Sequence, residues 1–562
     1  MTELGHEVAV AVVDSPAAME AAVREDEPQL IVCPFLKTMI PESIWAKHRC
    51  LIVHPGPKGD RGPSSLDWAI ELGAREWGVT VLEASGQLDA GDVWATRSFR
   101  VRDVGKSSLY RHEVRHAAIE ALVEAVGRIV AGEDPPQARE IEPASVTGRP
   151  HPLMTQDVRA IDWASDCFDR VARKIRAAEG HPGVLDSIQG KQFHLFGVHP
   201  ERNLRGRAGD IIATRNGAIC RATVDGAVWI THLKRRDRPD AKYFKLPATR
   251  ALELAGVEPQ VPEIAVAIDE PPGGNHTYRE IAYEEHGAVG YLHFDFYNGA
   301  MSTAQCRRLR EAYADVRSRR QTSVIVLMGG RDYFSTGIHL NVIEAAEDPA
   351  TESWRNLQAI NEVVRDIVET GSHIVVSALG GDAAAGGVPL ALAADYVVAR
   401  EDVVLNPYYQ HMGGLYGSEY WTYLLPRRVG VEMTSRLVGA PFTPVGARQA
   451  VRIGLVDDTF GATLERFHHQ TRCLAERLAS DAALERRLEQ KRRRRAHDQK
   501  LKPLHVYGGE ELARSYQCFF GCDRSYHRAR RRFAYKLGPL HTDSLLADAK
   551  DRGAARGAGC AA

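Results

Sequence analysis

Short apolar runs alternate with helical stretches in two separate blocks of this chain, and this alternation constrains the fold more than any other feature. In the first block the runs are EVAVAV, QLIVC, LIVH and VTVL, at residues 7–12, 29–33, 51–54 and 79–82. Short runs rich in β-branched residues, separated by helical stretches, are typical of an open, largely parallel α/β sheet. We therefore expect a domain of this kind over residues 1–150, with a helix over residues 106–132.

The pattern changes in the middle of the chain. Residues 172–246 consist of strand-length pieces such as IIATR, CRATV and AVWITHL, which glycine-rich turns divide. Pieces of this kind are typical of a small β-barrel or sandwich, so we expect a barrel domain over residues 156–255. Four prolines then predict an extended linker over residues 256–276.

The second α/β block follows this linker. The strand-like runs VIVLM at 324–328 and HIVVSAL at 373–379 alternate with helical segments, and the pattern becomes almost wholly helical after about residue 425. We expect a third domain over residues 277–540 and a flexible tail over residues 541–562. A chain of 562 residues is too long for one core at roughly 150 residues per domain, which agrees with this division.

Charge and composition exclude several classes of partner. Lys and Arg total 72 and Asp and Glu total 73, so the formal net charge of −1 provides no global field for nucleic acid or anionic lipid. No run of about 18 apolar residues predicts a membrane span. The nine scattered cysteines fit a reducing compartment, so we expect a cytoplasmic protein. From the charge and the lack of a long apolar run we expect no nucleic-acid or membrane partner.

Two short strings resemble functional motifs by chance. HEVRH at residues 112–116 matches the HExxH zinc motif, but no third ligand follows it, so we expect no metal site. KRRRR at residues 491–495 lies in a charged helical stretch with Glu485 and Glu489 before it. We interpret this string as a solvated face.

Three motifs of the first block carry a family resemblance. They are PFLKTMIP at 34–41, CLIVHPGPKGDRG at 50–62 and WGVTVLEASGQLDAGDVWA at 77–95. Together they resemble the amino-terminal domain of the transferases and hydrolases that use 10-formyltetrahydrofolate. The resemblance implies that His54 polarises the formyl group and shuttles a proton, and that Asp89 positions and activates this histidine. It also implies a folate-binding role for Phe35, Leu36 and Lys37.

The chain departs from this family in two places. Ile52 stands where the family usually has an asparagine, so backbone N–H groups or Lys58, Asp60 or Arg61 must replace one oxyanion donor, or the transfer differs in detail. The chain opens with ELGHEV, which resembles the end of the family's first helix and its second strand. We therefore expect an upstream extension of about 20 residues that begins with an apolar strand, and an impaired folate half without it.

The middle domain supports the same resemblance. Residues 174–198 (KIRAAEGHPGVLDSIQGKQFHLFGV) and 225–236 (DGAVWITHLKRR) resemble the carboxy-terminal barrel domain of the formyltransferases. In that barrel, basic residues meet a polyanion. A solvated basic turn is an equally good interpretation of the residues that would do so here, Lys234, Arg235, Arg236 and Arg238.

The third block resembles the enoyl-CoA hydratase/isomerase superfamily, or crotonases. YFSTGIHLN at 333–341 and GGDAAAGGVPLALAADYVVA at 380–399 each follow one of the strand-like runs. The resemblance implies coenzyme A as a ligand, with the thioester oxygen held by the backbone amides of Ile338 and Gly386. Such fixed dipoles stabilise the negative charge that develops on a thioester oxygen, and Gly387 lets the backbone approach the ligand.

The acid and base residues of the hydratases are not in this chain. Pro389 and approximately Tyr409 stand in place of the two glutamates, so simple hydration is not expected. The segment NPYYQHMGGLYGSEYW at 406–421 offers Tyr409 and Glu419 as an acid/base pair, with His411 as the alternative. Aromatic residues of this kind are otherwise core packing. Burial against Tyr408, Tyr416 and Trp421 is expected to raise the pKa of Glu419.

Over nearly its whole length the chain resembles the HypX/HoxX family of hydrogenase maturation factors. The resemblance implies transfer of a formyl group from 10-formyltetrahydrofolate to coenzyme A, and cleavage of formyl-CoA to carbon monoxide and coenzyme A for the nickel-iron hydrogenase. Maturation proteins of that hydrogenase are then possible partners beside the small-molecule substrates. The alternatives are a tRNA or nucleotide-sugar formyltransferase fused to an unrelated crotonase, and a non-catalytic assembly scaffold. The oligomeric state stays open.

Overall fold

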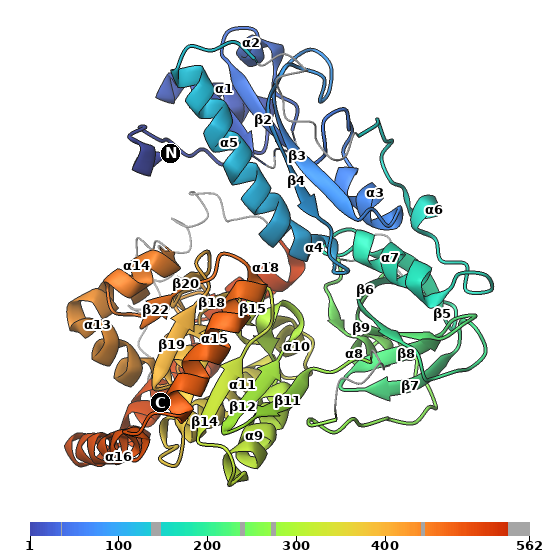
Figure 1. Ribbon diagram of the computed structural model, residues 1–562. Coiled ribbons are helices and arrows are strands. Elements are labelled where there is room, and N and C mark those ends of the chain that lie inside the picture. Colours follow the sequence, from blue (N-terminus) through green and yellow to red (C-terminus); the bar gives the residue numbers. More distant parts are fainter. Residues whose placement is uncertain are drawn as a thin grey trace. The chain divides into compact units, whose positions relative to one another are not determined.

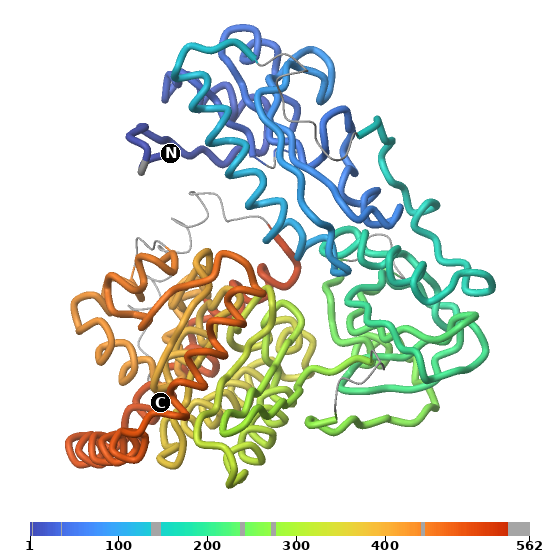
Figure 2. The backbone as a smooth tube through the Cα atoms, in the orientation of Figure 1, coloured from blue at the N-terminus to red at the C-terminus, as the bar shows by residue number. Residues whose placement is uncertain are grey.

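The computed structural model describes residues 1–34, 36, 38–135, 148–236, 242–270, 277–439 and 444–537. The chain divides into two compact units, coloured along the sequence in Figures 1 and 2. The first unit comprises residues 1–214, 218–237 and 252–262, and the second comprises residues 215–217, 238–251 and 263–562.

The first sheet is a mixed one. Its strands are β1 (Ile31–Pro34), β2 (Cys50–His54), β3 (Glu76–Glu83) and β4 (Val93–Arg100), in that order across the sheet. β1 and β2 are parallel and are joined through α2 (Glu42–Trp45), whereas the β2–β3 and β3–β4 pairs are antiparallel. The expectation of a largely parallel sheet therefore holds only for β1 and β2. The short connection between β3 and β4 returns the chain antiparallel, since a parallel return needs a long crossover.

The predicted strand at residues 7–12 is wrong. These residues form no strand, and the side chains of Val8, Val10 and Val12 are 48%, 85% and 99% exposed. A β-strand needs a neighbour to pair its backbone groups, and among the described strands β1 is hydrogen-bonded only to β2. The apolar run alone was therefore not enough to form a strand.

Helices cover this sheet. They are α1 (Pro16–Asp26), α3 (Ser65–Glu71), α4 (Lys106–Leu109) and α5 (Arg115–Val130), with a π-helical turn at Tyr110–Val114 between the last two. The predicted helix over residues 106–132 is confirmed. Ala117, Ala121 and Ala125 of α5 are buried in the core with the residues of β3 and β4, because their small side chains permit a close approach.

The barrel-like sheet has six strands, of which five follow one another in the order β5-β6-β9-β8-β7. Their bounds are β5 (Val184–Ile188), β6 (Lys191–Glu201), β7 (Ile211–Arg215), β8 (Ala218–Ala222) and β9 (Ala227–Arg235). The three strand-like pieces of the sequence are β7, β8 and β9, which confirms them. The first residues of the region expected to form strands, 172–177, instead belong to helix α7 (Phe168–Ala177). Strand β10 (Leu246–Pro247) and helix α8 (Ala248–Glu253) follow in the sequence.

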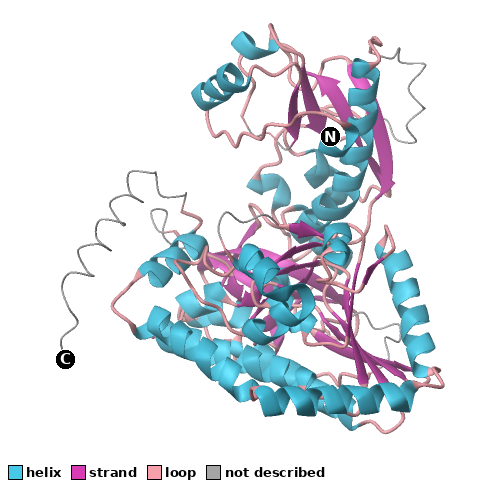
Figure 3. Ribbon diagram, turned by 90° about the vertical axis from the view of Figure 1, so that its left-hand side faces the viewer, coloured by secondary structure: helices cyan, strands magenta, loops and turns pink. Residues whose placement is uncertain are grey.

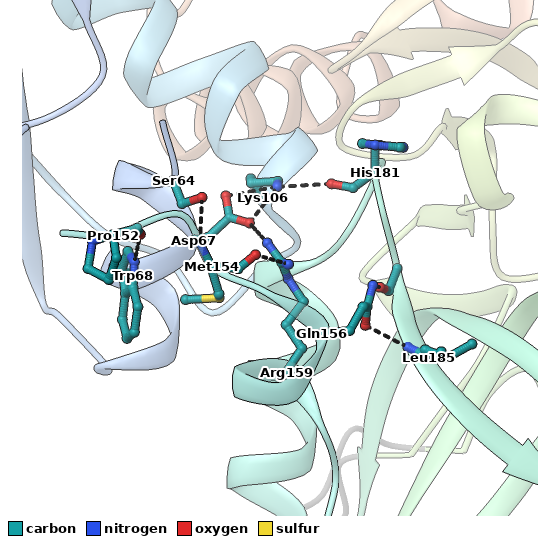
Figure 4. Close-up of polar contacts among 11 residues, drawn as sticks. Ser64, Asp67, Trp68, Lys106, Pro152, Met154, Gln156, Arg159, His181 and Leu185 are labelled. Atoms are coloured by element: carbon teal, nitrogen blue, oxygen red, sulfur yellow. Dashed lines mark hydrogen bonds and ion pairs between the residues drawn. The ribbon is translucent and has the colours of Figure 1, made fainter. Parts of the chain in front are cut away.

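A buried charge cluster joins these two parts of the first unit (Figure 4). The Asp67 carboxylate of α3 accepts hydrogen bonds from Lys106 Nζ at 2.8 Å and from Arg159 Nη2 at 2.6 Å, the latter from α6 (Gln156–Arg159). The Met154 N–H donates to Ser64 Oγ, and Gln156 accepts the Leu185 N–H of β5. The two cations compensate the buried carboxylate, which fixes the chain that leads from the first sheet to the barrel.

The second unit contains a six-stranded sheet in the order β11-β12-β14-β17-β19-β22, parallel except for the β11–β12 hairpin. The strands are β11 (Ile281–His286), β12 (Val289–Phe294), β14 (Val324–Met328), β17 (Ile374–Leu379), β19 (Tyr396–Ala399) and β22 (Asp458–Thr459). Every residue of β14 and β17 is buried, as expected for central parallel strands. Both expected runs are therefore confirmed as core strands.

Two smaller sheets accompany the six-stranded sheet in this unit. One pair is β13 (Ala300–Met301) with β16 (Gly337–Ile338). A second small sheet has the order β15-β18-β20-β21, with bounds Tyr333–Ser335, Asp382–Ala384, Val404–Asn406 and Val445–Gly446. β15 and β18 place the two loops that follow the central strands side by side.

Helices pack around the strands of this unit (Figure 3). They are α9 (Thr303–Ser318), α10 (Leu340–Glu344), α11 (Pro349–Val368), α12 (Gly387–Leu392), α13 (Trp421–Val438), α14 (Ala447–Arg452), α15 (Leu464–Ala479), α16 (Leu484–Leu501), α17 (Leu504–Phe520) and α18 (Ser525–Tyr535). The helical character expected after residue 425 is confirmed. No helix in the described part of the chain is long and apolar enough to cross a membrane.

Part of the basic string at 491–495 has a structural role. Lys491 Nζ donates to Asp395 Oδ2 at 2.6 Å and to the His373 carbonyl at 2.9 Å, and Arg493 pairs with Glu489 on the same helix. Arg238, residues 271–276 of the expected linker and the tail at 541–562 lie outside the described residues.

Candidate active sites

The first site lies at the carboxyl end of β2, where His54 is buried between two carboxylates. Its Nε2 is 2.8 Å from Asp60 Oδ2, and its Nδ1 is 3.5 Å from Asp89 Oδ2. The shorter contact is a hydrogen bond, whereas the longer one exceeds the usual range for N–H···O bonds. The structure thus brings together the predicted His54 and Asp89 and adds Asp60 to them.

Asp60 is placed by the loop that follows β2. Its backbone N–H donates to the Pro57 carbonyl at 2.9 Å, which folds the loop back onto His54. A Cβ on Gly56 would lie 2.2 Å from Asp60 Oδ2 and 2.5 Å from His54 Nε2, so this close approach requires glycine. The other oxygen, Asp60 Oδ1, is buried without a hydrogen-bond partner among the described residues.

Asp89 reaches His54 from the turn between β3 and β4. It has a left-handed backbone, with φ at 49°, and its Oδ2 also accepts the Gly62 N–H at 3.2 Å. This hydrogen bond ties the turn to the loop that carries Asp60. Both carboxylates of the site are therefore held by the same loop, which orients the imidazole from two sides.

The remaining residues predicted for this site have mixed outcomes. Ile52 packs against the apolar cluster that contains Cys33 and Met19, and Leu36 packs against the same cluster. Of the candidate substitutes Lys58, Asp60 and Arg61, it is Asp60 that contacts His54, and as a carboxylate it accepts rather than donates. Two predicted folate-binding residues, Phe35 and Lys37, lie outside the described residues.

The second site is a cavity of about 470 Å³ inside the second unit. Its lining brings together the predicted oxyanion residues Ile338 and Gly386 with the predicted pair Tyr409 and Glu419. The other lining residues are Thr336, Leu340, Leu357, Ala385, Asn406, Tyr408, His411, Met412, Leu415 and Gly417. The lining is mainly apolar, and Glu419 is its only carboxylate, so any charge on this group is poorly solvated.

Two loops supply the backbone of the cavity. Ile338 ends β16, and Gly386 precedes α12, whose first residue is Gly387. Gly387 lies outside the cavity lining, where its Cα packs against the Ser335 carbonyl. A Cβ on Gly386 would lie 2.3 Å from Glu419 Oε1, so the carboxyl group rests directly against this glycine. The position of Glu419 next to this loop therefore depends on a residue without a side chain.

Glu419 and Tyr409 form a buried pair. The Tyr409 hydroxyl donates to Glu419 Oε2 at 3.1 Å, and the Ser418 N–H donates to the same oxygen at 3.1 Å. Burial raises the pKa of the Glu419 carboxyl to about 8, and the nearby Glu511 carboxylate also raises it. Burial raises the pKa of Tyr409 well above its usual value, so this hydroxyl is a neutral donor. Glu419 can therefore exchange a proton near neutral pH.

The cause of this raised pKa differs in part from the expectation. Tyr408 lines the cavity, but Tyr416 and Trp421 do not, and their rings pack against each other at 5.2 Å. Burial is the main cause, as expected, but the second cause is Glu511 of α17, which lies 92 positions after Glu419. No local pattern around Glu419 points to this residue, so the sequence reasoning missed it.

No group of three or more His, Cys, Asp or Glu residues in the described ranges is arranged to hold a metal ion. The HEVRH string begins inside the π-helical turn and continues into α5. Pro389, at the place of a hydratase glutamate, is buried in α12 and is not part of the cavity lining.

Comparison with known proteins identifies three family matches. The family described as "Formyl transferase" matches residues 6–126, the family "Formyl transferase, C-terminal domain" matches residues 153–244, and the family "Enoyl-CoA hydratase/isomerase" matches residues 285–509. The His54 site falls in the first match and the Glu419 cavity falls in the third.

Relatives and solved structures extend these matches over nearly the whole chain. The hydrogenase maturation factor HoxX of Bradyrhizobium diazoefficiens is 44% identical over 97% of this chain and 93% of that protein. A crystal structure of HypX from Aquifex aeolicus in complex with tetrahydrofolic acid is 41% identical, with a TM-score of 0.89 over 96% of this chain and 93% of that chain. The cytosolic 10-formyltetrahydrofolate dehydrogenase of Xenopus laevis is 26% identical over 42% of this chain. The chain therefore belongs to the HypX/HoxX family of hydrogenase maturation factors, in which formyltransferase modules are joined to a crotonase-like module.

Proposed function

We propose that this chain transfers a formyl group from 10-formyltetrahydrofolate to coenzyme A and then cleaves the formyl-CoA to carbon monoxide and coenzyme A. The observation that carries the proposal is the cavity in which the buried Glu419–Tyr409 pair lies beside both oxyanion loops. The matches to formyltransferase and crotonase families support two successive reactions of one formyl group. The carbon monoxide is destined for the nickel-iron hydrogenase, with its maturation proteins as partners.

The domain limits follow the same division. We assign residues 1–150 and 156–255 to the formyl transfer and residues 277–540 to the cleavage of formyl-CoA. The family matches at 6–126, 153–244 and 285–509 support these limits.

The transfer step takes place at His54. The imidazole takes the proton of the coenzyme A thiol, the sulfur attacks the formyl carbon, and the bond from this carbon to the folate nitrogen breaks. The departing nitrogen receives a proton from the imidazole, so atoms and charges balance. Asp60 holds the ring through Nε2, whereas the longer contact between Nδ1 and Asp89 leaves the Asp89 side for the reacting groups.

The cleavage step takes place in the cavity of the second unit. The backbone amides of Ile338 and Gly386 hold the thioester oxygen, and the ionised Glu419 takes the proton from the formyl carbon. The carbon–sulfur bond breaks, carbon monoxide leaves, and the thiolate takes the proton back from Glu419. The Tyr409 hydroxyl orients the Glu419 carboxyl through the hydrogen bond to Oε2.

Hydration is not the reaction that this cavity favours. A hydratase uses two carboxylates, one to activate a water molecule and one to transfer a proton to the substrate. The residues that line this cavity include one carboxylate, Glu419. One group that alternately takes and returns a proton is sufficient for the cleavage of formyl-CoA, because no water is consumed.

The test uses the whole chain with 10-formyltetrahydrofolate and coenzyme A. We expect tetrahydrofolate and carbon monoxide in equal amounts, with the gas detected by its spectrum on a haem reporter. A second reaction with supplied formyl-CoA follows the cleavage step alone. Formyl transfer that proceeds without coenzyme A, or formyl-CoA that is not cleaved, contradicts the proposal.

A further inference from the structure

Helix α17 contacts the catalytic turn of the second unit through residues that lie beyond the region that matches the crotonase family. That match ends at residue 509, and Glu511 lies just beyond it. The Glu511 side chain is fully buried. Its Oε2 accepts the Tyr420 N–H at 2.8 Å, and its Oε1 accepts the Thr422 N–H at 2.8 Å and the Thr422 hydroxyl at 2.5 Å. All three donors belong to the few residues that directly follow Glu419.

The turn held in this way is a strained one. Glu419 and Tyr420 are consecutive residues with left-handed backbones, at φ values of 63° and 58°, and neither is glycine. Such a conformation costs free energy and persists only where the surrounding structure enforces it. Asn361 of α11 enforces it from a second side, because its Oδ1 accepts the Glu419 N–H at 2.7 Å. The side chains of Asn361 and Glu511 therefore hold the backbone N–H groups of Glu419 and of the next residue, Tyr420.

A second residue of α17 faces the same segment. Ser515 lies four residues after Glu511, so both side chains project from one face of the helix. The Ser515 hydroxyl donates to the Gly417 carbonyl at 2.8 Å. Residues 417–422, which include the catalytic carboxyl, are thus fixed by hydrogen bonds to one helix face.

We propose that Glu511 is a positioning residue for the cleavage of formyl-CoA: from α17 it holds the left-handed turn that presents the Glu419 carboxyl to the cavity. The inference rests on the proposed function of Glu419. It assigns a task in the reaction to the part of α17 that lies beyond the residues that match the crotonase family.

The charge of Glu511 adds a second effect to this geometry. The ionisable groups that face Glu419 are Tyr409, Cys306 of α9 and Glu511. Burial raises the pKa of Glu511 to about 7, and its negative charge in turn raises the pKa of Glu419. A loss of this charge lowers the pKa of Glu419, so the pH at which the base becomes active moves down.

The main experiment compares Glu511→Gln with Glu510→Gln in the cleavage of supplied formyl-CoA. Glu510 is the matched control, because it is the adjacent residue on α17 and its side chain is 58% exposed. In Glu511→Gln the amide loses one acceptor and the charge, so we expect kcat to fall about tenfold with little change in KM. We also expect the pH profile to move about one unit toward acid. Glu510→Gln keeps the wild-type kcat and profile.

A milder variant covers the case in which Glu511→Gln does not fold. Thr422→Val removes only the hydroxyl donor to Glu511 and keeps the shape of a partly exposed side chain. We expect kcat to fall about threefold, on the scale of one weakened hydrogen bond. Wild-type kcat and pH profile in the folded variants overturn the positioning role.

Infrared difference spectra distinguish this proposal from the proposed function. The carboxyl band of buried Glu419 is assigned by its loss in Glu419→Gln. This band is followed against pH in the wild type and in Glu511→Gln. If Glu511→Gln does not fold, Thr422→Val is used instead. A Glu419 band with the same frequency and the same titration as in the wild type overturns the role of Glu511, whatever the turnover, because the frequency reports how the carboxyl group is held and the titration reports the nearby charge. If the Glu419 band depends on Glu511 but the wild-type protein releases no carbon monoxide, the role of Glu511 stands and only the proposed function is overturned.

Discussion

The two candidate sites handle a proton in opposite environments. At the first site, His54 lies between Asp60 and Asp89, so the ring faces a carboxylate on each side. At the second site, Glu419 lies in an apolar cavity with a second carboxylate nearby, and the groups that hydrogen-bond to it, the Tyr409 hydroxyl and the Ser418 N–H, are neutral. An imidazole needs carboxylates to hold its orientation and its proton, whereas a carboxyl group becomes a base near neutral pH only when it is desolvated. The difference predicts different responses to mutation and pH.

The largest expected effect is the separation of the two reactions by His54→Ala. Without the imidazole, formyl-CoA formation from 10-formyltetrahydrofolate falls by about 10³-fold or more, and Asp89→Asn has an effect in the same direction. Cleavage of supplied formyl-CoA stays at the wild-type rate, because the two sites belong to different compact units. Rates of both half-reactions on one folded preparation check this. A loss of both activities means that the sites are not independent.

The next effect concerns the second site. Glu419→Gln and Tyr409→Phe each slow carbon monoxide release by about 10²-fold, and formyl-CoA accumulates because the first site still works. In the wild type the rate rises with pH toward about 8, as burial holds the Glu419 pKa near this value. A haem reporter and chromatography of the coenzyme A esters measure both quantities. Wild-type release from both variants redirects the search to His411.

The sequence predicted the main residues of both sites. His54 ends an apolar strand and Asp89 follows the next one, and the resemblance of their motifs to the formyltransferases paired the two residues. Ile338, Gly386, Tyr409 and Glu419 likewise come from loops that follow predicted strands, and all four line one cavity. Local patterns are sufficient where the sheet itself aligns the loops.

The failures come from contacts that only the folded chain defines. Residues 7–12 have the composition of a strand but pair with no strand that the structure describes, and pairing is a tertiary property. Glu511 reaches Glu419 only because α17 packs against the segment at 417–422, and no spacing in the sequence reveals this contact. Asp60 was a candidate, but its role as an acceptor opposite His54 Nε2 depends on the fold of the loop.

The desolvated carboxyls of the second site predict a pH-dependent stability. Glu419 has a folded pKa of about 8 against an ordinary value of 4.5, so the folded chain binds more protons than the unfolded chain between these values. Stability therefore falls as pH rises through the folded pKa, by about 3 kcal/mol between pH 6 and pH 9 for this one group. Denaturant unfolding of wild type and Glu419→Gln at both pH values checks the slope. An equal slope in the two proteins contradicts the buried ionisation.

The smallest effect tests whether Asp60 belongs to the first site at all. Asp60→Asn keeps the size of the side chain but replaces the charge that faces His54 Nε2, so the imidazolium formed during transfer loses one of its two compensating carboxylates. We expect formyl-CoA formation to fall about tenfold, less than for His54→Ala, because Asp89 still faces Nδ1. Asp103→Asn is the matched control, since the Asp103 side chain is fully exposed. Cleavage of supplied formyl-CoA should stay unchanged in both variants. If Asp60→Asn transfers the formyl group as fast as Asp103→Asn, then Asp89 alone orients the imidazole of His54. The contrast between the His54 site and the Glu419 site then rests on one carboxylate rather than two.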